Sequence, residues 1–122
     1  MQTQTREFYH GANGDKILHI IRLGVLWPDA EHKLYFSPWR FDSVLMHGGD
    51  MKRNATFATK LQVKIPEDAV LKQQPTEGVP DTLIITTSRP LEAVVLELYI
   101  REPGGSTVKV LRGIQGITEY LA

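Results

Sequence analysis

The sequence predicts an α+β fold: a single domain over residues 1–122 with a mostly antiparallel or mixed sheet. Strand-like apolar runs fill the middle and later parts of the chain, whereas helical periodicity is concentrated in its first half. This segregation favours an α+β architecture over an alternating, doubly wound one. With 122 residues, 42% of them hydrophobic and 23% charged, the chain is large enough for one core and has the composition of a globular protein.

The expected elements follow the chain in this order: a strand over 7–10, a helix over 15–23, a strand over 34–36, a second helix ending at Gly48, strands over 56–65, 83–87, 93–100 and 107–111, and a short helix over 115–121. Residues 1–6 are polar, and we expect them to be loose. In the first helix, Asn13 or Asp15 can accept a backbone N–H at the start, and Gly24 suits a left-handed cap at the end. Isoleucines three and four residues apart give this helix one buried stripe.

The second helix and the longest strand have their own signals. Ser37 followed by Pro38 suits a helix that begins with a capping hydroxyl and a proline in its first position. Apolar and polar residues alternate over 56–65, which predicts a half-buried strand of an antiparallel sheet. The segment over 72–80 is rich in proline and is predicted to be a surface loop, while Pro90 interrupts the later strands because it has no N–H for a sheet ladder.

The composition excludes several classes of protein. Fourteen basic residues balance fourteen acidic ones, so no net field draws the chain to nucleic acid or to a membrane surface. The absence of cysteine excludes a disulfide scaffold and a thiol nucleophile. No apolar run is long enough to span a bilayer and the first residues do not resemble a signal peptide, so we expect a cytoplasmic protein. No histidine has a second ligand at metal-binding spacing, and we expect no metal site.

Three short motifs carry the functional hypothesis: FYHGA over 8–12, KLYFS over 33–37 and LEAVV over 91–95. Each is a strand-like run that presents one polar or aromatic group, and together they place His10, Tyr35 and Glu92 in that order along the chain. The sequence resembles an ADP-ribosyltransferase domain of the His-Tyr-Glu class, the class of diphtheria toxin and the poly-ADP-ribose polymerases. The resemblance covers most of the chain and implies an ADP-ribosyltransferase-like fold, with a split sheet and two early helices.

In such a domain the substrate is NAD, whose nicotinamide–ribose bond breaks through a ribosyl cation, so positioning and electrostatics supply most of the catalysis. The resemblance implies that His10 and Glu92 hold the ribose and that the backbone of Gly11 pairs with the nicotinamide amide. It also implies that Tyr35 stacks on the nicotinamide ring, with Ser37 close to the amide. ADP-ribose then passes to an unknown acceptor, which is a protein, a nucleic acid or a small molecule, or to water in an NAD glycohydrolase.

Several alternatives stay open at this point. Glu97 is a second candidate for the carboxylate, but it lies an odd number of residues beyond Glu92 and is expected on the opposite sheet face. Ala12 stands where the class commonly has a hydroxyl-bearing residue, so one hydrogen bond to the substrate is missing. The alternative function is a non-catalytic binding or interaction module that retains the fold, for example in a phage or bacterial system. The loop over 72–80 is the expected place for acceptor contacts.

Five further residues have two interpretations each. Arg40, Lys52 and Arg53 flank the second helix, and they form either a pyrophosphate-binding group or a solvated basic face. Trp27 and Trp39 either stack on a base or are buried at the edges of helices.

Overall fold

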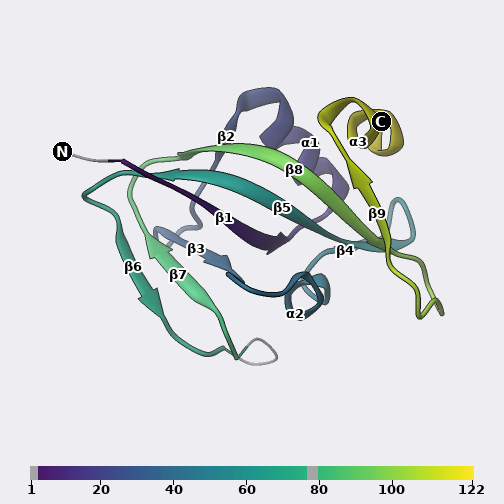
Figure 1. Ribbon diagram of the computed structural model, residues 1–122, viewed down its shortest axis with the longest axis horizontal. Helices are drawn as coiled ribbons and strands as arrows, with labels where there is room; N and C mark the ends of the chain where they lie inside the picture. Colours follow the sequence, from purple (N-terminus) through teal and green to yellow (C-terminus); the bar gives the residue numbers. More distant parts are fainter. Residues whose placement is uncertain (1–2, 77–79) are drawn as a thin grey trace.

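The computed structural model describes residues 3–76 and 80–122, and Figure 1 shows how their elements are arranged. The helices are α1 (Gly14–Leu23), α2 (Phe41–Leu45) and α3 (Ile114–Leu121). The strands are β1 (Gln4–Gly11), β2 (Val25–Leu26), β3 (Lys33–Phe36), β4 (Gly49–Asp50), β5 (Ala55–Ile65), β6 (Val70–Gln73), β7 (Leu83–Thr86), β8 (Leu91–Arg101) and β9 (Lys109–Arg112). The predicted α+β class with mostly antiparallel sheets is therefore confirmed.

Two antiparallel sheets form the body of the molecule. In the larger sheet, β1, β5, β8 and β2 are neighbours in that order, while β4 pairs with β5 and β9 pairs with β8. The smaller sheet has the order β3-β7-β6. Tyr9 of β1 and Ser37, the residue after β3, exchange backbone hydrogen bonds of 2.8 and 2.9 Å, and this isolated bridge joins the two sheets. The ends of β1 and β3 are thereby held side by side.

One large core holds the sheets and helices together. Phe8 and Phe36 stack with their ring centroids 5.0 Å apart, so β1 and β3 share this core. Ile17 on α1 and Ile117 on α3 are fully buried in it, and Figure 1 shows α1 and α3 lying next to each other. A smaller apolar cluster lies under α2, which packs against β1 and β5. The helix α2 therefore covers part of the second face of the larger sheet.

A bulge in β8 decides which of its side chains face the main core. Lys60 of β5 pairs with Glu97, whereas its neighbour Leu61 pairs with Val95, so one residue of β8 is left without a partner. Cross-strand partners share a sheet face, and successive residues of a strand point to opposite faces. Glu97 and Glu92 therefore point to the same face. The expectation that they point to opposite faces was wrong, because the unpaired residue of the bulge lies between them and interrupts the alternation of side chains along β8.

The capping signals of the first helix are confirmed. Asn13 Oδ1 accepts the backbone N–H of Lys16 at 2.9 Å, and Gly24 closes α1 in a left-handed conformation with φ of 70°. The alternation in β5 is confirmed as well, since its odd-numbered residues are buried, whereas Lys60, Gln62 and Lys64 point to the second face.

Two elements, β1 and α2, each begin three residues away from the predicted start. β1 begins at Gln4, because residues 4–6 pair with the end of β5 instead of being loose. α2 begins at Phe41 rather than at Pro38, because Arg40 has an extended backbone, with φ of −142° and ψ of 125°. The chain bends through Pro38 and Trp39 after the bridge, and the helix starts beyond Arg40.

The predicted surface loop over 72–80 begins inside an edge strand. Its first two residues belong to β6, which pairs with β7 along its whole length. The side chains of β6 are mostly exposed, so its sequence lacks the apolar alternation of a half-buried strand. Residues 77–79, within the expected acceptor-contact loop, lie outside the described residues.

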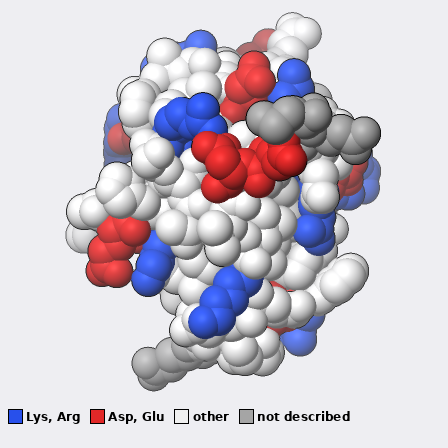
Figure 2. Space-filling view, turned by 90° about the vertical axis from the view of Figure 1, so that its left-hand side faces the viewer, with Lys and Arg blue, Asp and Glu red and all other residues white. Residues whose placement is uncertain are grey.

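The outer surface carries charges of both signs. On the face in Figure 2, Lys and Arg side chains lie interspersed with Asp and Glu, and some of the exposed charges form ion pairs, such as Arg89 with Asp68 at 2.6 Å. The described residues on this face form no extended basic patch of the kind that binds a nucleic-acid backbone. Within the described part of the chain, no helix has the length and apolar character needed to cross a membrane.

Candidate functional site

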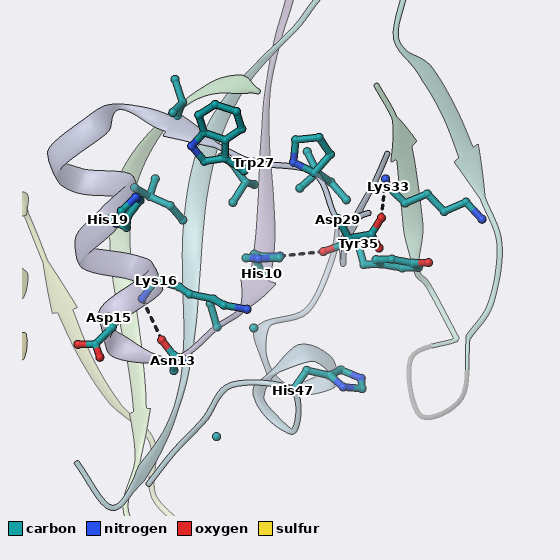
Figure 3. A pocket seen from close by; sticks show the side chains of 18 residues that line it. His10, Asn13, Asp15, Lys16, His19, Trp27, Asp29, Lys33, Tyr35 and His47 are labelled. Carbon is teal, nitrogen blue, oxygen red and sulfur yellow. Dashed lines mark hydrogen bonds between the residues drawn. The ribbon is translucent and has the colours of Figure 1, made fainter. Parts of the chain in front are cut away.

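A cavity of about 720 Å³ opens between the end of β1, the first turns of α1, the segment that follows α1, and β3. Its wall includes His10 and Gly11 from β1, Lys16 from α1, Trp27 from the segment after α1, and Tyr35 from β3 (Figure 3). The volume lies in the range of about 300–1,000 Å³ that is usual for small-molecule sites. Two of the three predicted motifs therefore meet at one cavity.

His10 is fixed by one hydrogen bond between the two sheets. Its Nδ1 lies 2.8 Å from the backbone carbonyl oxygen of Tyr35 (Figure 3). Because a carbonyl oxygen only accepts, Nδ1 carries the hydrogen and Nε2 of the neutral ring is left as an acceptor. Burial lowers the pKa of His10 from its ordinary value of 6.5; the Tyr35 hydrogen bond opposes this shift, and the charge of Lys16 adds to it. The imidazole is therefore neutral at pH 7.

Two aromatic side chains in the cavity wall keep part of their rings open to solvent. Tyr35 is 40% exposed and Trp27 is 60% exposed. Rings of this kind offer a flat apolar surface on which a ligand ring can stack. Trp39 is also largely exposed but is not part of the cavity wall. Burial at a helix edge is thus excluded for both tryptophans, and Trp27 is the one placed to meet a ligand.

Gly11 is required by packing as well as by its place at the cavity. A Cβ atom at this position would lie 2.0 Å from the backbone carbonyl oxygen of Val44 in α2. Only glycine allows β1 and α2 to approach this closely. The resemblance assigned a substrate contact to the backbone of Gly11, and the structure places this backbone at the cavity wall.

A second, largely apolar cavity of about 450 Å³ shares the wall formed by His10, Gly11 and Tyr35. Its lining also includes Thr76 and Thr82, whose Oγ1 atoms lie 2.7 Å apart. Neither threonine was predicted from the sequence, because both lie outside the motifs: Thr82 joins the site through the pairing of β7 with β3, and Thr76 through its hydrogen bond to Thr82. The only local signal was that Thr82 directly precedes a predicted strand.

Ser37 lies next to the site but is committed to other contacts. Its Oγ donates to Asp81 at 2.5 Å and accepts the backbone N–H of Arg40 at 3.0 Å. The residue is fully buried and forms part of neither cavity wall. The structure therefore gives Ser37 the role of a link between the end of β3, the start of α2 and the segment before β7.

Both candidate glutamates lie on the sheet face opposite to His10. His10 pairs with Thr59 of β5, whereas Glu97 pairs with the next residue of β5, Lys60. Adjacent residues of one strand point to opposite faces, and the bulge puts Glu92 on the same face as Glu97. The structure thus brings His10 and Tyr35 together without the glutamate of the third motif.

Each glutamate also has partners of its own. Glu92 has a side chain that is 71% exposed and lies 3.7 Å from the Nζ of Lys64. Glu97 accepts a hydrogen bond from the Tyr99 hydroxyl and another from Arg112 Nε at 2.7 Å. The hydrogen bond from Tyr99, supported by that from Arg112, lowers the pKa of Glu97, so this carboxylate is ionised. It lines neither of the two cavities.

The three cations considered for a pyrophosphate are ion-paired. Arg40 lies 2.8 Å from Asp42, while Lys52 and Arg53 lie 3.6 and 2.9 Å from Asp15. These three basic residues are absent from the described wall of either cavity. They form surface and structural ion pairs rather than a free basic group.

A comparison of the chain with protein-family models, curated proteins and solved structures finds no match in any of the three. The functional assignment must therefore come from the geometry of the two cavities and from the motifs that meet at their common wall.

Proposed function

We propose that the chain binds a nicotinamide nucleotide, NAD in the first place, beside the ends of β1 and β3. The observation that carries the proposal is the meeting of His10, Gly11 and Tyr35 at a wall shared by two cavities. A dinucleotide has two halves of different polarity. A larger cavity lined by polar and apolar residues, next to a smaller and largely apolar one, is suited to such a ligand.

The side chains at the common wall match the chemistry of the nicotinamide–ribose half. A ribose hydroxyl can donate to Nε2 of His10, since the hydrogen bond to the Tyr35 carbonyl leaves this nitrogen as the acceptor. The half-exposed ring of Tyr35 offers a stacking surface for nicotinamide, and Trp27 offers another within the larger cavity. Binding would therefore depend on the hydrogen bond that holds His10 of β1 against β3, and on the aromatic rings of Tyr35 and Trp27.

The geometry supports binding better than catalysis. Stabilising a ribosyl cation requires negative charge close to the ribose. The carboxylates in the wall of the larger cavity are Asp15 and Asp29. Asp15 is ion-paired with Arg53 at 2.9 Å. Asp29 accepts the backbone N–H groups of Glu31 and Lys33 at 2.8 and 3.0 Å. With Glu92 on the opposite face, a non-catalytic binding module is the function that we place first.

ADP-ribosyl transfer is the second candidate. His10 and Tyr35 are the part of the predicted catalytic set that meets at the cavity, and positioning alone can supply a large share of the barrier reduction for a dissociative reaction. Such an activity would not use Glu92. Its acceptor would be a protein, a nucleic acid, a small molecule or water.

Calorimetric titration of the purified chain with NAD tests the proposal, with nicotinamide release measured in the same samples. His10→Gln and Tyr35→Ala are each expected to weaken binding about fivefold, the equivalent of about 1 kcal/mol for one hydrogen bond or one aromatic contact. Trp39→Ala is the control, because this exposed ring lies outside the cavity wall. Binding without nicotinamide release supports the binding module, and release that persists in Glu92→Gln supports the second candidate. An absence of binding at millimolar NAD overturns both.

A further inference from the structure

Lys16 is the cation of the larger cavity that has no ion-pair partner among the described residues. Lys33 also lines this cavity, but its Nζ lies 3.6 Å from Glu31. Figure 3 shows the side chain of Lys16 extending from the first turn of α1 toward His10, whereas the Lys33 side chain points away from it. The cavity therefore contains one positive charge that no carboxylate of the described residues neutralises.

The groups that could neutralise Lys16 are used elsewhere. Asp15, the neighbouring residue, is ion-paired with Arg53 and Lys52 on the side of α1 away from His10. Asn13 accepts the backbone N–H of Lys16, so its Oδ1 caps the helix. The charge of Lys16 is also felt at His10, whose pKa it helps to lower. The ammonium group thus lies close to the ring that we expect to contact the ribose.

We infer that Lys16 binds a phosphate group of the ligand, so that the site selects phosphorylated nucleotides over phosphate-free nucleosides. This inference rests on the proposed function and names the residue that recognises the anionic part of the ligand. Two backbone N–H groups at the start of α1 already have acceptors, since the N–H of Gly14 donates to Asp50 and that of Lys16 to Asn13. The flexible ammonium offers three N–H donors to phosphate oxygens.

The test compares Lys16→Met with Lys33→Met as the matched control, since both lysines line the cavity and, among the residues that the structure describes, only Lys33 has an ion-pair partner. The probes are NAD, ADP and nicotinamide riboside, each titrated into the wild type and both variants. Loss of a charge-assisted hydrogen bond is expected to weaken NAD and ADP binding about tenfold or more in Lys16→Met. Nicotinamide riboside binding should change less than about twofold, and Lys33→Met should change none of the three by more than that.

The outcomes separate this inference from the proposed function. If Lys16→Met binds NAD and ADP as tightly as the wild type does, the inference is overturned while the nicotinamide site stands. Equal losses of NAD and ADP affinity in both lysine variants also overturn it, because the loss then comes from the lower positive charge of the cavity and not from a contact of Lys16. ADP binding that requires Lys16, without any binding of nicotinamide riboside, supports the phosphate contact and overturns the nicotinamide contact. Lys16 is exposed, so circular dichroism spectra that match the wild type are expected for both variants.

Discussion

Arg53 is the side chain on which we expect the stability of the site to depend most. Its guanidinium donates to Asp50 at 2.9 Å, to Asp15 at 2.9 Å and to the backbone carbonyl of Leu121 at 2.7 Å. Asp50 in turn accepts the backbone N–H of Gly14, the first residue of α1, at 2.7 Å. This cluster fastens the start of α1, one wall of the larger cavity, to the end of α3.

Replacing Arg53 by methionine removes the cation and keeps much of the side-chain volume. The side chain of Asp50 is only 3% exposed and that of Arg53 15%. Burial alone would raise the pKa of Asp50, but hydrogen bonds from Gly14 and Arg53 hold it below its ordinary value of 3.8. Removing one partner of a buried pair costs about 3–5 kcal/mol. We expect about 3 kcal/mol, because two backbone N–H groups still donate to Asp50.

Urea denaturation followed by far-ultraviolet circular dichroism measures this loss. Tryptophan fluorescence is less suitable, because both tryptophans are already largely exposed in the folded chain. Lys52→Met is the matched control: the residue adjoins Arg53 and pairs with the same Asp15 at 3.6 Å, but its side chain is 72% exposed. Its loss should stay below about 1 kcal/mol. Equal losses in the two variants would refute the idea that the buried pair with Asp50 anchors α1.

Three further predictions concern the residues around the cavities. Gly11→Ala should lower the free energy of unfolding, measured by urea denaturation, by about 1–3 kcal/mol, because the new Cβ would meet a carbonyl oxygen of α2 at 2.0 Å. Gly116→Ala is the control: this residue of α3 has open space around it, so the substitution should raise the free energy of unfolding by about 0.5–1 kcal/mol. Glu92→Gln should change the free energy of unfolding by less than about 0.5 kcal/mol and leave NAD affinity unaltered, since its ion pair with Lys64 is exposed; a tenfold loss of affinity in calorimetry would contradict this. Because the folded-state pKa of His10 is lowered, the unfolded chain takes up this proton first, so the free energy of unfolding should fall as the pH drops below 6.5. His10→Gln should remove that part of the pH dependence, and an unchanged slope would argue against a neutral His10.

The sequence was most informative where neighbouring residues decide the structure. The capping residues Asn13 and Gly24 predicted the bounds of α1 to within one residue, because a helix cap depends on the backbone of the residues next to it. The alternation in β5 likewise revealed which of its residues face the core. The approach of His10 to Tyr35 followed from the motifs, although the bridge that holds the two strands together was not foreseen.

Prediction failed where distant segments decide the structure. The sheet face to which Glu92 and Glu97 point depends on the register of β8 against β5 and on a bulge. Neither can be predicted from the alternation of apolar and polar residues within β8. Ser37 has the residue type of a helix cap and its hydroxyl accepts the backbone N–H of Arg40, but the extended backbone of Arg40 delays the start of α2 to Phe41. Thr82 enters the smaller cavity only because β7 pairs with β3.

The most direct test of the proposed site is an NMR titration of the labelled chain with NAD, followed through backbone amide shifts. We predict that the largest shifts occur at His10, Gly11 and Tyr35, and that the amides of Glu92 and Lys64 on the opposite face do not move. Shifts centred on Glu92, or no shifts at millimolar NAD, would contradict a nucleotide site between β1 and β3.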